Sequence, residues 1–275
     1  MTTSATGKSP RRSVRSTTVG GIIVILAIIG AIGAGLFVWF GLFDVAASTK
    51  HSTPVEWFLH FVMERSVAHY APELPVPDLR DAALIERGAL HYASGCAACH
   101  GAPGQLASPI AQQMTPVPPG LYSAGKDFDP SQLFWIVKNG VKMTAMPAWT
   151  APDRSDEIWA MVAFIEHLPQ LKTPEYLALV GNQPTASWLP GAPPSAAAFD
   201  PAACASCHGA DGRGRDGAFQ SIAGLSEAEL ENALRAYRDG GRPSGFMQPV
   251  AAQLSDAQIV AAAKYYAALP LAGAP

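Results

Sequence analysis

The stretch CAACHGAPG at residues 96–104 recurs 108 residues later as CASCHGADG at residues 204–212. Each copy holds two cysteines separated by two residues, with a histidine directly after the second cysteine. The similarity continues further along the chain, because SDEIWAMVAFIEHLP at 155–169 is echoed by SDAQIVAAAKYYAALP at 255–270. A repeat of this kind indicates one type of domain used twice.

The Cys-x-x-Cys-His pattern is the attachment signature of c-type haem. On one helical turn, the two sulfurs can reach the two vinyl-derived carbons of one haem edge, and the adjacent imidazole can lie under the iron. The sequence therefore predicts two covalently bound c-type haems, one on Cys96, Cys99 and His100 and the other on Cys204, Cys207 and His208.

Two other interpretations of the cysteines fit less well. Zinc ribbons bring their ligand pairs about 15–20 residues apart, whereas these two motifs are separated by 104 residues. A thioredoxin-like redox pair belongs in a βαβ setting, and no strand-like alternation of useful length is present. All four cysteines fall in the two pairs, and in an oxidising compartment unmodified thiols tend to form disulfides.

The second axial position of a haem iron is commonly filled by Met or His. In the second repeat, Met247 follows His208 by 39 residues in a Gly/Pro-rich loop, GGRPSGFMQP, and we predict that it is the ligand. The matching stretch of the first repeat, NGVKMTAMPAW, offers Met143 and Met146. Met146 is preferred, because the following Pro147 restricts it to an extended backbone that can help to hold the sulfur inward.

The N-terminal region predicts a transmembrane anchor at residues 20–43, an uncharged run of 24 residues. As a helix this run is about 36 Å long, enough to cross a hydrocarbon core of about 30 Å. Four basic residues precede it, which assigns residues 1–19 to the cytoplasm and the rest of the chain to the periplasm. The alternative is a cleaved signal peptide ending near Ala47, although the apolar part of a signal is usually about 7–15 residues long.

After the anchor, residues 44–78 are predicted to hold an interfacial helix and a proline-rich connector. The helix is indicated by the spacing of its large apolar residues, Trp57, Phe58, Phe61 and Val62. The first globular domain is then expected at 79–180, a linker at 181–203 and the second domain at 204–275.

Helix signals dominate both domains. Asp129 with Gln132, Ser226 with Glu229, and Ser255 with Gln258 each form the sequence pattern of a capping box. We therefore expect an all-α fold: two tandem domains following an N-terminal transmembrane helix.

The charge of the chain restricts its partners. Net charge is −3, but without the four N-terminal basic residues it becomes −7, from 15 basic and 22 acidic residues. An acidic outer part argues against nucleic acid and suits a docking partner that presents Lys and Arg.

Taken together, these motifs resemble class I cytochrome c repeated in tandem, over about 190 residues. The resemblance implies that an early helix and the last helix of the first domain cross closely, at Gly88 and Tyr92 on one side and Trp159 and Phe164 on the other.

The resemblance also implies that the carbonyl of Pro119 accepts the second N–H of His100, which fixes the ring. The second repeat departs from the family at two points. It has Gln220 where this proline is expected, and its first helix is nearly absent.

A His/Met pair leaves no open iron position for a substrate, which favours an electron carrier over an enzyme. The expected role is electron transfer in a respiratory chain outside the membrane, as a shuttle or as the cytochrome subunit of a dehydrogenase or terminal oxidase. The expected redox partners are a dehydrogenase, a quinol-oxidising complex or a terminal oxidase. The alternative is a dihaem peroxidase, which needs one haem with a vacant or displaceable ligand.

Overall fold

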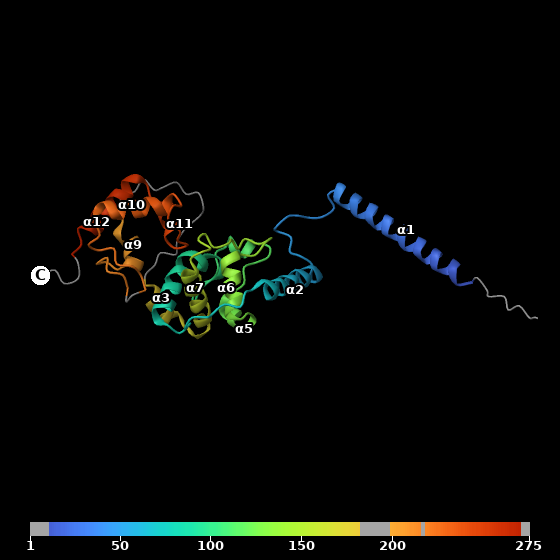
Figure 1. Ribbon diagram of the computed structural model, residues 1–275, viewed down its shortest axis with the longest axis horizontal. Helices are drawn as coiled ribbons and strands as arrows, with labels where there is room; N and C mark the ends of the chain where they lie inside the picture. Colours follow the sequence, from blue (N-terminus) through green and yellow to red (C-terminus); the bar gives the residue numbers. More distant parts are fainter. Residues whose placement is uncertain (1–10, 182–198, 216–217, 271–275) are drawn as a thin grey trace, which may run out of the picture. The chain divides into compact units, whose positions relative to one another are not determined.

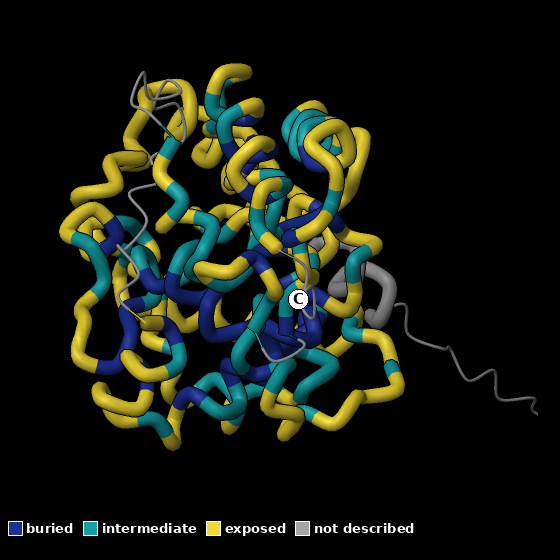
Figure 2. Tube along the Cα trace, turned by 90° about the vertical axis from the view of Figure 1, so that its left-hand side faces the viewer, coloured by how far each residue is buried: buried dark blue, intermediate teal, exposed yellow. Residues whose placement is uncertain are grey.

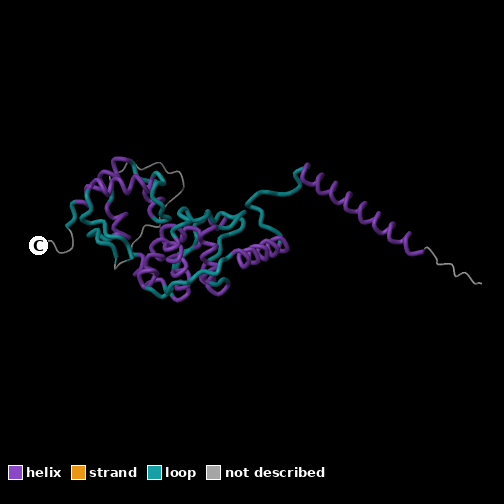
Figure 3. The backbone as a smooth tube through the Cα atoms, in the orientation of Figure 1, coloured by secondary structure: helices purple, strands orange, loops and turns teal. Residues whose placement is uncertain are grey.

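The structure of the chain is a computed structural model that describes residues 11–181, 199–215 and 218–270. Within these residues every regular element is helical, and the only strand-like feature is an isolated bridge between Ala102 and Gln105 (Figure 3). The expected all-α fold is confirmed. The chain divides into two compact units, residues 1–49 and residues 50–275.

The first unit contains one long helix, α1 (Arg11–Trp39) (Figure 1). Its segment Val19–Trp39 is long and apolar enough to cross a membrane. The helix begins nine residues before the predicted span and ends four residues before residue 43, just ahead of Gly41, whose φ of 63° turns the chain. These helix limits leave the anchor at residues 20–43 a prediction, because a helix can extend past the part of it that crosses a membrane.

The second unit opens with α2 (Thr53–Tyr70), at the place predicted for the interfacial helix. One side of α2 packs on the first domain, since Val67 is buried and the ring of Tyr70 stacks on Trp135 at 6.4 Å. The large apolar residues named above lie exposed on the helix: Trp57, Phe58, Phe61 and Val62.

The first domain consists of five main helices and several short turns. The helices are α3 (Ala82–His91), α4 (Ala97–His100), α6 (Pro130–Asn139), α7 (Ser155–His167) and α8 (Thr173–Val180). Shorter elements are a π-helical turn (Tyr92–Cys96), α5 (Ala124–Asp127), and 3₁₀ turns at Ala111–Gln113, Leu121–Ser123 and Leu168–Gln170. The core lies where α3 and α6 contact α7, which is buried along most of its length. Figure 2 shows buried and exposed stretches alternating along the chain.

Helices α3 and α7 cross at Gly88. A Cβ atom at this position would overlap the carbonyl oxygen of Ala160 and lie 2.7 Å from the Cβ of Phe164, so the crossing requires glycine. The rings of Tyr92 and Phe164 meet beside it, with centroids 5.0 Å apart. The expected crossing is therefore present, although the ring of Trp159 packs in a tilted arrangement against Phe134 of α6, with centroids 4.7 Å apart.

The second domain contains α9 (Pro201–His208), α10 (Glu227–Arg238), α11 (Met247–Ala251) and α12 (Asp256–Ala267). Its own core cluster is small, with three buried members, Leu230, Ala263 and Tyr266. Among the described residues it has no helix before α9, and Cys207 and Phe219 pack against the core of the first domain instead. Residues 182–198 of the predicted linker lie outside the described part of the chain.

Candidate haem-binding sites

The first Cys-x-x-Cys-His motif forms the end of a continuous helical segment. Cys96 closes the π-helical turn, and Cys99 and His100 lie on α4. The segment ends at Gly101, whose φ of 71° favours glycine. The hydroxyl of Tyr92 donates to the Gly101 carbonyl at 2.6 Å, which holds the end of the turn against the α3–α7 core.

A backbone carbonyl orients the first imidazole. Nδ1 of His100 lies 2.8 Å from the carbonyl oxygen of Pro119. Because a carbonyl only accepts, Nδ1 carries the proton and Nε2 keeps a free lone pair, which is the arrangement of a metal ligand. Burial lowers the pKa of His100, and the hydrogen bond to Pro119 opposes this effect.

The second motif repeats this arrangement on α9, which carries Cys204, Cys207 and His208 and ends at Gly209 with a φ of 79°. Nδ1 of His208 lies 2.9 Å from the carbonyl oxygen of Gln220. The absence of the expected proline therefore does not remove the hydrogen bond, because the acceptor is a main-chain atom. Burial lowers the pKa of His208 as well.

The four cysteines form no disulfide, and burial raises the pKa of three of their thiols, those of Cys96, Cys204 and Cys207. Burial raises the pKa of Cys96 to about 12 and that of Cys204 to about 11, with the partner cysteine of each pair adding to the effect. Redox-active Cys-x-x-Cys pairs show a lowered pKa instead. Two thiols on one turn beside an imidazole with a free Nε2 fit haem c, which would be held through both sulfurs and that nitrogen.

Two methionines compete for the remaining iron position in the first domain. The side chain of Met143 is 94% exposed on a backbone with a φ of 61°, whereas Met146 is half-buried. The Met146 carbonyl accepts the N–H of Val141 at 3.2 Å, and a Cβ at Gly140 would lie 2.6 Å from that carbonyl oxygen. The loop is thus held closely at Met146 and points Met143 to solvent.

Met247 in the second domain is half-buried, and it is the first residue of α11 rather than part of a loop. The predicted loop, residues 240–249, therefore ends at Phe246, and α11 was not predicted because its five residues are too few to give a periodic signal. Ser244 supports the start of this helix from two residues before its N-cap, Phe246. Its Oγ accepts the N–H of Met247 at 3.0 Å, and its N–H donates to Gln248 Oε1 at 3.2 Å.

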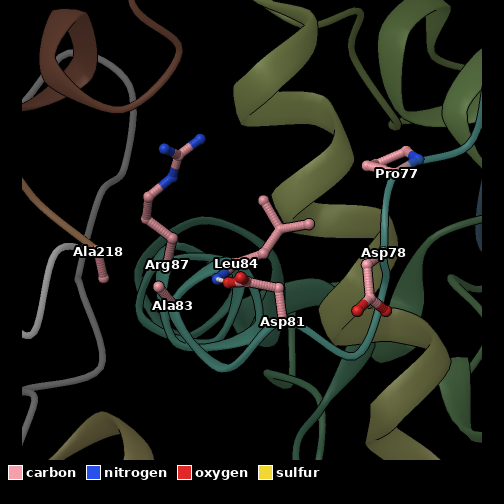
Figure 4. Close-up of a pocket in the computed structure, with 7 residues that line it drawn as sticks. All are labelled: Pro77, Asp78, Asp81, Ala83, Leu84, Arg87 and Ala218. Atoms are coloured by element: carbon pink, nitrogen blue, oxygen red, sulfur yellow. Dashed lines mark hydrogen bonds between the residues drawn. The ribbon is translucent and has the colours of Figure 1, made fainter.

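A surface pocket elsewhere in the second unit is shown in Figure 4 and is lined by Pro77, Asp78, Asp81, Ala83, Leu84, Arg87 and Ala218. None of these residues belongs to a Cys-x-x-Cys-His motif. Asp81 caps α3 by accepting the N–H of Leu84 at 2.8 Å, and Arg87 donates to the main-chain carbonyl of Asp156 at 2.9 Å. The polar groups of this pocket therefore serve the fold of the first domain.

Comparison with known proteins agrees with these sites. The model of the family described as "Cytochrome C oxidase, cbb3-type, subunit III" matches residues 83–165 and 194–265, more than half of the chain. Each matched segment contains one Cys-x-x-Cys-His motif and one of the two predicted methionine ligands, Met146 in the first and Met247 in the second.

Individual relatives point in the same direction. The chain is 43% identical over 194 residues, 65% of its own length and 80% of the relative's, to the "Thiosulfate dehydrogenase electron acceptor" of Thiomonas intermedia (strain K12). It is 42% identical over 66 residues, 23% of its length and 80% of the relative's, to "Cytochrome c-554(548)" of Halomonas halodenitrificans. No solved structure matches the chain significantly.

Proposed function

Because the chain belongs to the c-type cytochrome family whose model is described as "Cytochrome C oxidase, cbb3-type, subunit III", we propose that it is a dihaem electron carrier tethered to the cytoplasmic membrane. It is an electron-transfer cytochrome and not itself an enzyme, in keeping with relatives named as an electron acceptor and a cytochrome c. This argues against the dihaem peroxidase alternative. Proteins of this family carry covalently bound haem c, and this chain has two places to hold it.

The observation that supports two haems is the pairing, in each domain, of a thiol pair with an imidazole oriented by a main-chain carbonyl. Haem iron supplies one-electron exchange when bound. The cysteines would tether the two groups, Nε2 of His100 and of His208 would ligate one side of each iron, and Met146 and Met247 the other.

Haem stoichiometry tests this proposal directly. We expect two haems c per polypeptide from the alkaline pyridine spectrum of the purified full chain. Replacing both cysteines of either pair by alanine should leave one haem, and Ser206→Ala, inside the second motif but without a thiol, should leave two. A single haem in the unchanged protein would contradict the proposal.

The chain is proposed to face the periplasm, with α1 retained as its anchor. Support comes from the length and apolar character of Val19–Trp39 and from the basic residues that precede it. N-terminal sequencing of the protein purified from membranes tests the anchor, because a signal peptide would leave a mature chain that begins near residue 48.

The electron donor we propose is a thiosulfate dehydrogenase or a similar periplasmic dehydrogenase, since a relative covered over 80% of its length is named as the electron acceptor of such an enzyme. Mixing the oxidised cytochrome with purified thiosulfate dehydrogenase and thiosulfate should reduce both haems. Omitting either the enzyme or thiosulfate should abolish the reduction. Absence of reduction in the complete mixture would rule out this donor.

A second candidate role, as a fixed subunit of a terminal oxidase, is favoured by the description of the family model. Purification from native membranes in mild detergent separates the two roles. A subunit should elute with oxidase polypeptides and their haems at a constant ratio, and a shuttle should elute alone.

A further inference from the structure

A buried carboxylate of the first domain is bonded to the second domain. The side chain of Glu157, in the first turn of α7, is almost fully buried, and both of its oxygens are used. Oε1 accepts the hydroxyl of Ser244 at 2.6 Å and lies 3.1 Å from Nη1 of Arg154. Oε2 accepts the N–H of Gly245 at 2.6 Å and Nε1–H of Trp149 at 3.3 Å.

All four of these partners present a hydrogen to Glu157, and a carboxylate is the side chain that accepts from all of them at once. Removing the carboxylate would leave buried donors without an acceptor, which costs more than an ordinary hydrogen bond contributes. The site therefore requires this residue type rather than any polar side chain of similar size.

The carboxylate is two hydrogen bonds away from the main chain of Met247. The single hydroxyl hydrogen of Ser244 points to Glu157, so the lone pairs of that oxygen accept the N–H of Met247 at 3.0 Å and of Phe246 at 3.2 Å. The same carboxylate holds Trp149, three residues after Met146. One side chain thus joins the two segments that carry the proposed methionine ligands.

The segment before Met247 also fits the surface of the first domain by shape. A Cβ at Gly245 would overlap the indole ring of Trp149, so this contact requires glycine. The ring of Phe246 packs on the ring of His91, the last residue of α3, with the two ring centroids 3.9 Å apart. The carbonyl of Pro243 accepts Nη1–H of Arg154 at 3.2 Å.

We propose that Glu157 is a positioning residue for the second haem: the first domain, through this carboxylate and Ser244, places Met247 at the iron of the other domain. The inference rests on the proposed function, in which Met146 and Met247 are ligands. The need for such support follows from the small core of the second domain and the five-residue length of α11.

The test uses full-length protein carrying Glu157→Gln, which puts an amide N–H among donors, or Ser244→Ala, which removes only a hydroxyl. The matched control is Glu166→Gln on the same helix, whose Oε1 is buried without a hydrogen-bond partner among the described residues. The readouts are the red-edge sulfur-to-iron absorption band of the oxidised protein and carbon monoxide binding to the reduced protein.

We expect Glu157→Gln and Ser244→Ala to weaken the band and to create a carbon monoxide site, and the control to change neither. In the double variant with Met247→Ala, Glu157→Gln should cause no further loss of the band. In the double variant with Met146→Ala, Glu157→Gln should remove most of the band that Met146→Ala leaves. Such non-additivity with one methionine alone identifies the second haem as the one affected.

An unchanged band and no carbon monoxide binding in Ser244→Ala would overturn the inference, and this variant decides if Glu157→Gln does not fold. If Met247→Ala itself leaves the band intact, the proposed ligand of the second haem is wrong. The failure of the inference and the failure of the proposed function are therefore separate outcomes.

Discussion

At the scale of single residues, the attachment motifs were predictable because their chemistry is local. Cys96, Cys99 and His100 are neighbours in the chain, so their spacing alone brings them to one turn. Glu157 was not predictable in the same way. Its partners Ser244 and Gly245 are 87 and 88 residues away, and no periodicity or spacing in the sequence links positions in two domains.

The choice between the two methionines of the first domain is a testable case. We expect Met146→Ala to allow carbon monoxide to bind the reduced first haem, since its sixth ligand would be lost. Met143→Ala should leave the protein unchanged, because that side chain is 94% exposed. Carbon monoxide difference spectra compare the two variants. Binding in Met143→Ala and none in Met146→Ala would reverse the assignment.

The close approach of Gly245 to Trp149 predicts a steric effect on stability. Gly245→Ala should lower the free energy of unfolding by about 1–3 kcal/mol, the usual cost of overpacking a well-filled site. Gly241→Ala is the matched control in the same segment, because its nearest neighbour would be 3.7 Å away. Thermal unfolding followed by circular dichroism measures the difference. Equal midpoints for the two variants would show that the indole ring can move aside.

At the scale of elements, the helices with strong capping signals were predicted well. Helices α6, α10 and α12 begin at the capping boxes of Asp129, Ser226 and Ser255, and both hydrogen bonds of each box are present. Helix α11 was not predicted, because it carries no such signal and is too short to show a period.

Helix α2 carries a prediction of its own about the membrane. With Val67 and Tyr70 on the packed side, the exposed side presents Trp57 and Phe61, whose rings stack at 5.6 Å. Exposed aromatic side chains on one face of a helix, here with Arg65 close by, are typical of helices that lie in the interfacial zone of a bilayer. We expect it to rest there in the full chain.

Quenching by brominated lipids checks this in the reconstituted full chain. The difference in fluorescence between the unchanged protein and Trp57→Phe is the emission of Trp57. We expect brominated lipids to quench this emission strongly. The fluorescence removed by Trp135→Phe should be quenched much less, because Trp135 lies under Tyr70 on the packed side. Equal quenching of the two contributions, or none for Trp57, would show that the exposed face of α2 does not enter the lipid.

At the scale of the whole second unit, the repeat predicted two domains of one kind, and the nearly absent first helix of the second repeat did not show that the two domains share a core. The first domain has a large core around α7, whereas the second has three buried members in its own cluster and packs Cys207 and Phe219 on its neighbour. An ion pair between Nε of Arg215 and Oε1 of Glu86, 2.8 Å apart, also joins the second domain to α3 of the first. Such contacts depend on tertiary structure and leave no periodic trace in sequence.

This inequality predicts how the protein unfolds. The second domain should not melt on its own at low temperature, because part of its core belongs to the first domain. Calorimetry of the full chain, with the haem absorption followed in parallel, should show one transition that both haems report. Two well-separated transitions would mean that each domain is held by its own core.

The contacts of the Ser244–Met247 segment with Trp149 and Glu157 also make the two copies of the repeat non-interchangeable. Two copies of an ancestral unit begin as equals that could exchange places along the chain. Here the leading copy holds the carboxylate and the indole, and the trailing copy holds the serine and the glycine that fit them. Putting each copy in the other's position would leave both Cys-x-x-Cys-His motifs intact, yet none of these four groups would then face its present partner.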